Sequence, residues 1–250
     1  MKTQDVQIAG RDHPATGSGV DWRILAVWTG IGTIATLFVF TAIIGAFIPP
    51  LVVFALLYGV GVWLTRKGGR AGPIMLAVLS LLFVASNAPF VVPALAVPAS
   101  TVDFVMSGLL MVLALTNFVA AIAALRSAST GARAGLVGRA SVVLMLLVIV
   151  VAVIGRLTYD SPPAQTGDVE IATQDFEFSS DVIQADGGEV SVFIDNKDSA
   201  LHTFTVEELD VDVAVPGGST ARVTFDAAAG TYEFICLPHE SEMKGTLEVR

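Results

Sequence analysis

The residues best suited to chemistry lie in one short stretch near the C-terminus. Cys236 is followed three residues later by His239, and Met243 comes four residues after that histidine. His202 lies well upstream of this stretch, and the remaining histidine of the chain is His13. Because the 250 residues contain a single cysteine, an intrachain disulfide and a two-cysteine redox pair are both excluded.

A thiolate, two imidazoles and a thioether form the donor set that suits a one-electron copper site. Sulfur donors favour Cu(I), imidazole serves both oxidation states, and a rigid trigonal arrangement changes little when an electron moves. Taken singly, the residues have plainer interpretations. A lone cysteine is usually a small buried hydrophobe, and a methionine usually fills space. A lone histidine is usually a surface or satisfied core residue.

The stretch from Tyr232 to Val249, taken with His202 upstream, resembles the cupredoxin family of plastocyanin, amicyanin and pseudoazurin. The resemblance covers the last ~85 residues. It implies an all-β Greek-key sandwich that binds one mononuclear blue-copper ion through His202, Cys236, His239 and Met243. It also implies that the amide of Thr203 points at the cysteine sulfur. The spacing between His239 and Met243 is intermediate between the amicyanin and plastocyanin loops.

The sequence around these residues is typical of a β-sandwich or barrel of roughly eight short strands. Turn sequences such as Asp186-Gly187-Gly188 separate the segments. A Pro- and Gly-containing linker is predicted at 161–167, followed by the copper domain at 168–250. Strands are predicted at 170–178, 189–195, 202–206, 220–225, 231–236 and 245–249.

The preceding residues have a different character, because long apolar stretches with few charges replace the short alternating segments. Each stretch is judged against the ~20 residues needed to cross a bilayer core, and none has the polar face of a soluble helix. The sequence therefore predicts a cytoplasmic tail at 1–22 and an all-α transmembrane domain at 23–160. Five spans are expected, at about 24–48, 51–65, 73–97, 102–125 and 141–159.

Charge divides the chain in the same place. Residues 1–160 carry 10 Lys and Arg against 5 Asp and Glu, whereas residues 161–250 carry 4 against 18. The basic residues precede the first span and lie in the second and fourth connections. The positive-inside rule therefore predicts a multi-pass cell-membrane protein with a cytoplasmic N-terminus and an extracytoplasmic copper domain. A four-span alternative would put the acidic domain in the cytosol and leave the charge pattern unexplained.

The spans offer few groups for chemistry of their own. They contain no histidine, so bis-histidine haem ligation is excluded. Asp103 is expected at the outer end of the fourth span, where water is accessible. Arg156 is expected to extend towards the lipid headgroups. Asn87 and Asn117 are interpreted as residues that hydrogen-bond between helices. A single helix would be enough to anchor the copper domain, so the role of the other helices stays open.

The leading hypothesis is an electron carrier, not an enzyme, that cycles between Cu(I) and Cu(II) and serves a redox partner such as a cytochrome c or respiratory complex. His239 is the expected exit for the electron, with an apolar patch around it. Acidic residues could steer a basic partner or merely keep the domain soluble, and no nucleic-acid partner is expected. The patch residues are Leu201, Pro216, Leu237 and Pro238, and the acidic residues are Glu207, Glu208, Asp210, Asp212, Glu240 and Glu242.

Two alternatives belong to other classes. Copper oxidases and nitrite reductases bind further copper ions through additional histidines, which this chain lacks. The second alternative is copper handling outside the cytoplasm, with the helices as a transporter or docking platform. A buried cysteine ligand favours retention of copper over exchange, but the sequence discriminates these two functions only in part.

Overall fold

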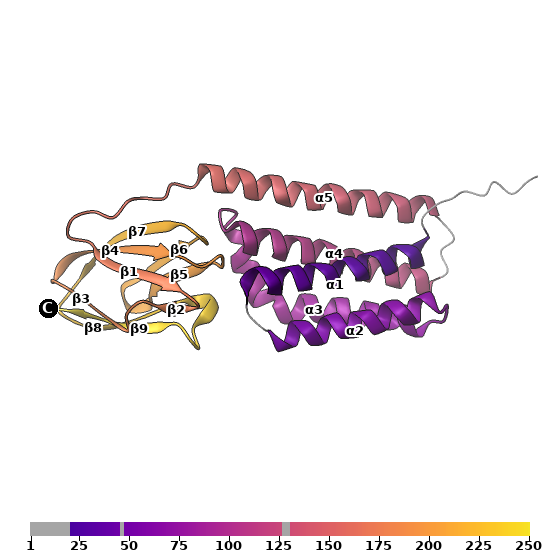
Figure 1. The fold of residues 1–250 in the computed structure, drawn as a ribbon, viewed down its shortest axis with the longest axis horizontal. Helices are drawn as coiled ribbons and strands as arrows, with labels where there is room; N and C mark the ends of the chain where they lie inside the picture. The colour runs from indigo at the N-terminus through magenta and orange to yellow at the C-terminus, as the bar shows by residue number, and fades with distance from the viewer. Residues whose placement is uncertain (1–20, 46–47, 127–130) are drawn as a thin grey trace, which may run out of the picture.

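The computed structural model describes residues 21–45, 48–126 and 131–250, and it divides into a helical and a strand-rich part (Figure 1). Most of the predicted tail at 1–22, including His13, therefore lies outside the described residues. Five helices come first and form an elongated bundle. The helices are α1 (Trp22–Ile44), α2 (Pro49–Arg66), α3 (Ala71–Ala96), α4 (Thr101–Leu125) and α5 (Gly131–Thr158).

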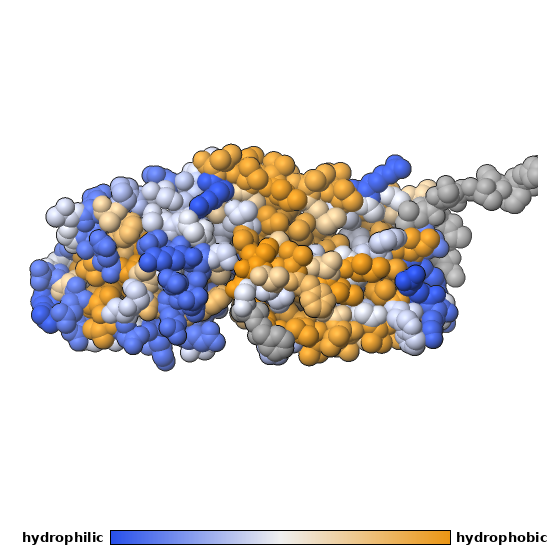
Figure 2. All heavy atoms as spheres, in the orientation of Figure 1, coloured by the Kyte–Doolittle hydropathy of each residue, from blue (hydrophilic) through white to orange (hydrophobic). Residues whose placement is uncertain are grey.

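All five helices are long and apolar enough to cross a membrane, so the chain is a membrane protein. Figure 2 shows the apolar belt that their outward-facing side chains form. One boundary differs most from the hydropathy pattern. α5 begins at residue 131, about ten residues before the predicted span, because hydropathy locates the apolar part of a helix and not its end. α3 runs through Pro89 and Pro93 and ends at Ala96, within one residue of the predicted end of the third span.

A line of polar side chains crosses the interior of the bundle. Tyr58 lies 3.0 Å from the hydroxyl of Ser80, which in turn lies 3.2 Å from the side-chain oxygen of Asn117. The amide nitrogen of Asn117 donates to the carbonyl of Ala26 in α1 at 2.7 Å. The prediction that Asn117 bonds between helices is confirmed. Asn87 instead donates to the carbonyl of Phe83 one turn earlier in its own helix.

The strand-rich part is a β-sandwich of two mixed sheets, as predicted. One sheet has the order β2-β1-β4-β7 and the other the order β3-β9-β8-β5-β6. Apolar side chains from both sheets form one core, which also contains Cys236 and Met243. The strands are β1 (Val169–Gln174), β2 (Glu177–Phe178), β3 (Val182–Ala185), β4 (Gly188–Asn196), β5 (His202–Val206), β6 (Val211–Val215), β7 (Thr220–Ala227), β8 (Gly230–Ile235) and β9 (Lys244–Val249).

The single strand predicted at 170–178 is two strands, β1 and β2, which pair antiparallel. Asp175 and Phe176 have φ values of 55° and 63°, in the left-handed region that few side chains favour. This turn reverses the chain and carries Phe176 towards the end of the sandwich that faces the helices. β3 and β6 were not predicted either, because each is short and flanked by residues typical of turns.

The sandwich lies against one end of the helical bundle (Figure 1). This is the end at which α3 finishes and α4 begins, and the C-terminus lies at the opposite end of the sandwich. Arg156 does not extend freely into lipid, because its guanidinium donates to the carbonyl of Gly218 at 2.9 Å and to the hydroxyl of Ser219. Tyr159 donates to the carbonyl of Thr220 at 3.1 Å. These contacts hold the C-terminal end of α5 and the residue after it, just before the predicted linker, against the β6–β7 turn and the start of β7.

Candidate metal centre

Two neighbouring strands place the first two candidate ligands. His202 is the first residue of β5, and Cys236 directly follows β8, the strand paired with β5 through Thr205 and Ile235. The short 3-10 helix η2 (Leu237–His239) then turns the chain, with the amide of His239 donating to the carbonyl of Cys236 at 2.9 Å. The sheet and the turn together bring the three side chains to the end of the sandwich that faces the helices.

The ligand atoms of His202, Cys236 and His239 all lie within 4.8 Å of one another. The Cys236 sulfur is 3.5 Å from Nδ1 of His202 and 3.5 Å from Nδ1 of His239. Metal–nitrogen bonds of about 2.0 Å and metal–sulfur bonds of about 2.3 Å would separate nitrogen and sulfur by about 3.7 Å in a trigonal plane. The three side chains are therefore spaced to share one ion.

Hydrogen bonds hold the cysteine in place. Cys236 is fully buried, and its sulfur accepts from the amide of Thr203 at 3.3 Å. The Thr203 hydroxyl accepts from the amide of Leu237 at 2.9 Å, which links β5 to the ligand loop. Burial raises the pKa of the Cys236 thiol, and the Thr203 amide acts in the opposite direction. A bound cation would supply the missing stabilisation of the thiolate.

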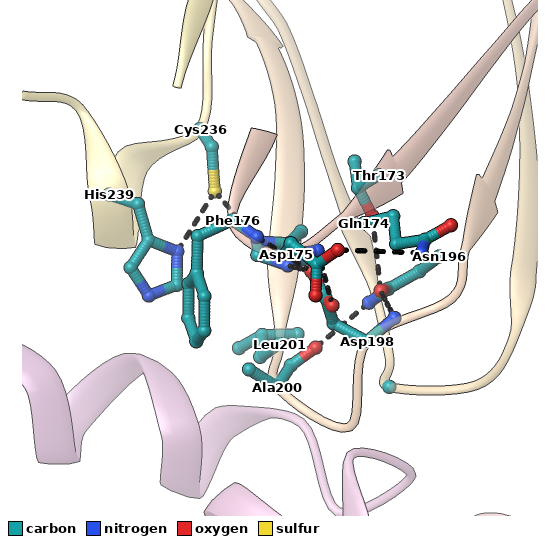
Figure 3. A network of polar contacts seen from close by, with 12 residues as sticks. Thr173, Gln174, Asp175, Phe176, Asn196, Asp198, Ala200, Leu201, Cys236 and His239 are labelled. Atoms are coloured by element: carbon teal, nitrogen blue, oxygen red, sulfur yellow. Dashed lines mark hydrogen bonds and ion pairs between the residues drawn. The ribbon is translucent and has the colours of Figure 1, made fainter. Parts of the chain in front are cut away.

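A carboxylate fixes the orientation of His202. Nε2 of His202 lies 2.8 Å from Oδ2 of Asp198, so Nδ1 faces the sulfur. Asp198 also accepts from the amides of Asp175 and Phe176, at 2.8 and 3.2 Å (Figure 3). Burial opposes the ionisation of Asp198, but the hydrogen bonds from His202 and these two amides outweigh it and lower its pKa. A carboxylate behind a ligating imidazole orients the ring and raises its basicity.

Sequence reasoning missed Asp198. It lies four residues before His202, in a turn sequence where an aspartate has an ordinary structural explanation. Asn196 occupies the same turn, and its Nδ2 donates to the carbonyls of Ala200 and Val215 at 2.9 and 2.8 Å. Its Oδ1 accepts from the amide of Asp198 at 3.0 Å. The approach to the first ligand is therefore held by a closed set of hydrogen bonds.

Phe176 covers one side of the centre. Its ring packs edge-on against His239 with centroids 4.9 Å apart, and against His202 at 5.7 Å. Burial, together with the nearby His202, lowers the pKa of His239 to about 4. Burial also lowers the pKa of His202. Both imidazoles are therefore neutral near pH 7, which is the form that binds a metal.

Met243 lies in the same loop and is 1% exposed. Its amide donates to the carbonyl of His239 at 2.8 Å, and its carbonyl accepts from the amide of Cys236 at 3.0 Å. The backbone of Met243 thus closes the loop that carries two of the candidate ligands. Its role as the fourth, axial ligand stays a prediction from the sequence.

The arrangement fits a mononuclear blue-copper site, since one thiolate and two imidazoles converge in a rigid, buried setting. Comparison with known families agrees with this chemistry. Residues 144–249 match the family described as a cupredoxin-like domain, and the match begins within α5. No curated protein matches the chain.

Solved structures similar to the chain include copper proteins and an oxidase. Amicyanin from Paracoccus versutus is 16% identical, with 35% of this chain and 85% of the amicyanin covered and a TM-score of 0.30. A rusticyanin mutant is 17% identical, with 39% and 92% covered and a TM-score of 0.26. A chain of a haem-copper terminal oxidase dimer is 18% identical, with 48% and 100% covered and a TM-score of 0.30. From the family match and the geometry of the site, the C-terminal part of the chain is a cupredoxin-like copper-binding domain that follows five candidate membrane spans.

Proposed function

We propose that the protein carries single electrons at the membrane surface through one copper ion held by His202, Cys236 and His239, with Met243 as the axial ligand. One observation carries the proposal: the ligand atoms of His202, Cys236 and His239 already lie close enough together to bind one ion. The bound copper would supply the exchange between Cu(I) and Cu(II). Because hydrogen bonds and burial fix the ligands, little has to move when the charge changes, and a small reorganisation favours fast transfer.

In this role the protein is an electron carrier and not an enzyme. Phe176 packs against both histidines, and His202 and Cys236 are fully buried. A small substrate would have to displace one of these groups to reach the ion. A second copper centre built from histidines would need more of them than the three in the sequence. Both points favour outer-sphere electron transfer over bond-making chemistry at the metal.

We place the copper domain outside the cytoplasm. In the structure the domain lies at the end of the bundle where α3 meets α4, and the short connection there, residues 97–100, has no Lys or Arg. The connection between α2 and α3 contains Lys67 and Arg70, directly follows Arg66 of α2, and lies at the opposite end. The positive-inside rule then places the basic end in the cytoplasm. The domain boundaries follow as a tail at 1–22, spans within 23–160, a linker at 161–167 and the copper domain at 168–250.

The proposed partner is a basic redox protein such as a cytochrome c or a component of a respiratory complex. Exposed carboxylates of Glu207, Glu208 and Asp210 follow β5, the strand that begins at His202. A five-residue strand spans about 16 Å, so this acidic end lies away from the helices but within one strand length of the metal. Leu237, which is bonded to Cys236 and is 45% exposed, remains accessible as a point of contact.

Expression of the full chain with copper tests the proposal. Electron transfer predicts intense absorption near ~600 nm from the copper–thiolate bond and a reversible one-electron couple. Replacement of Cys236 by serine should abolish the colour. If the protein is instead colourless and releases its copper readily to a chelator, the proposal is wrong and copper handling is the better assignment.

A further inference from the structure

Residues of the copper domain and of the membrane helices line a cleft of about 720 Å³ between the two parts. This volume lies within the range of about 300–1,000 Å³ that small-molecule sites occupy. Aromatic rings from α1, α2, α3 and the β1–β2 turn line its walls, and Phe54 and Phe83 pack edge to face with centroids 5.4 Å apart. The five aromatic residues are Phe40, Phe54, Phe83, Phe90 and Phe176.

One candidate copper ligand also lines this cleft. His239 and its neighbour Pro238 form part of the wall contributed by the copper domain, together with Leu201. Figure 3 shows the rings of His239 and Phe176 directed towards the helices. Two residues of the apolar patch that the sequence placed around His239, Leu201 and Pro238, therefore face the bundle, and Leu201 is only 5% exposed. A molecule in the cleft would be separated from the copper only by the imidazole of His239.

Polar groups occur at a few places in this otherwise apolar lining. Asn87 and Ser107 contribute from α3 and α4, and Asp103 and Glu242 lie where the helices meet the copper domain. Asp103 is held in position because its carboxylate accepts from the amide of Leu201 at 2.7 Å and from the hydroxyl of Ser100 at 2.9 Å. Apolar walls with a few convergent polar groups are typical of sites for small organic ligands.

We propose that this cleft binds a lipid-soluble hydroquinone, which acts as the electron donor to the copper site. The inference rests on the proposed electron-transfer function. A hydroquinone ring has flat faces that suit phenylalanine side chains, and its two hydroxyl groups can bond to carboxylate, amide and hydroxyl groups. Its apolar tail would follow the lipid-facing surface of the helices. A simple acyl chain has no polar atoms that could form hydrogen bonds with the polar groups of the cleft.

The redox balance is simple. A hydroquinone that becomes a quinone loses two electrons and two protons. Two successive one-electron transfers reduce Cu(II) to Cu(I) twice, the proposed basic partner removes each electron in turn, and the two protons pass to water at the domain boundary. The residues of the cleft bind and orient the ring beside His239, and they need no covalent role.

A binding experiment on the copper-free full chain in phosphatidylcholine nanodiscs tests the site. The probe is an azido-benzoquinone with a decyl tail, cross-linked by light and located by mass spectrometry. We expect labelling of α3 and α4 near Phe90 and Ser107, and competition by unlabelled decylbenzoquinone. Replacement of Phe90 by alanine should weaken binding roughly tenfold, as for the loss of one aromatic contact. Phe90 is 63% exposed, so this change should not disturb folding.

Phe38 provides the matched control, because it is also an exposed phenylalanine of a span, at 54%, but does not line the cleft. Phe38→Ala should leave binding unchanged. Labelling spread over all lipid-facing helices, no competition, or equal effects of the two substitutions would overturn the proposal and indicate that lipid acyl chains fill the space. Because binding is measured without copper, its outcome is separate from the colour and potential measurements that test electron transfer.

Discussion

At the scale of single residues, the candidate ligands and the groups that support them were not equally predictable. Spacing and residue type identified Cys236, His239 and His202, because together they supply the thiolate and the two imidazoles that a one-electron copper site requires. Asp198 and Phe176 gave no such signal, since an aspartate in a turn and a phenylalanine between strands are common. Their positions beside the histidines depend on the left-handed turn at 175–176, which the sequence does not reveal.

Asp198 should tune the reduction potential of the copper site. Its negative charge lies 2.8 Å from Nε2 of His202 and stabilises the more highly charged Cu(II) state. The substitution Asp198→Asn keeps the size of the side chain but removes the charge. We expect the potential to rise by on the order of 50 mV, as measured by redox titration of the visible absorption. Asp186→Asn removes the same charge from an exposed turn far from the site, and a similar shift in that control would contradict the prediction.

The lowered pKa of His239 predicts a pH dependence of the copper-free protein. The folded-state pKa is about 4, below the ordinary value of 6.5, so the unfolded chain takes up a proton first as the pH falls. The resulting stability is fully present above pH 6.5 and is lost as the pH falls towards 4. Thermal unfolding of the β-rich domain, followed by circular dichroism, should therefore show a lower midpoint at pH 5 than at pH 7.

A His239→Gln variant is the control for this measurement. It lacks the titrating group, so the difference between its midpoints at the two pH values should be smaller than that of the unchanged protein. His202 also has a lowered pKa and contributes to the part that remains. An undiminished pH dependence in the variant would show that His239 does not cause the effect.

At the scale of secondary structure, long elements were predicted better than short ones. An uninterrupted apolar stretch identifies a span because almost every residue contributes to the signal. β2 has only two residues and β3 only four, so alternation cannot be detected in them. α3 continues through Pro89 and Pro93, although a proline in a helix normally breaks or kinks it. In a membrane, neighbouring helices can compensate for the lost hydrogen bonds. The helix propensity of a residue does not take these neighbours into account.

The N-terminal turn of α4 should determine how firmly the copper domain is held. Asp103 accepts from the amide of Leu201 at 2.7 Å, and the hydroxyl of Ser100 lies 3.4 Å from the amide of Gly217. Asp103→Ala removes a charged acceptor from the segment that leads to His202. We expect the Leu201 amide to exchange with deuterium roughly ten- to a hundredfold faster. Asp160→Ala, at an exposed carboxylate just before the linker, should leave that rate unchanged, and equal rates in both variants would exclude the role of Asp103.

At the scale of the whole molecule, the contact between its two parts was the feature that the sequence could not supply. Asp103 was expected in water and Arg156 in the headgroup region, yet both bond to the copper domain. Each expectation treated the membrane helices and the sandwich as independent. Hydrogen bonds between residues 62 and 98 positions apart leave no periodic pattern in a sequence, so only the folded arrangement shows that the metal end of the sandwich faces the bundle.

The orientation of the molecule in the membrane gives a further prediction. Fusion of alkaline phosphatase after Arg250 should yield an active enzyme, because this reporter requires an extracytoplasmic location. A green fluorescent protein at the same position should remain dark when exported in the unfolded state. Both reporters placed at the N-terminus should behave in the opposite way. Active phosphatase at the N-terminus would reverse the proposed orientation, and with it the location of the copper site.

The acidic surface provides the last prediction, because steering and simple solvation have different consequences. If the carboxylates of Glu207, Glu208 and Asp210 attract a basic partner, the rate of electron transfer to a cationic c-type cytochrome should fall as salt rises. Neutralising all three with Gln, Gln and Asn should lower the rate at low ionic strength by roughly tenfold and have little effect at about 0.5 M salt, where the Debye length is only a few ångströms. The matched control neutralises the exposed Glu170, Glu177 and Glu189, which removes the same charge from strands β1, β2 and β4. Stopped-flow measurement of the rate of copper oxidation decides between the two roles. An equal loss of rate in both triple variants would indicate only an effect of net charge. If neither variant loses rate, these carboxylates serve only to keep the domain soluble.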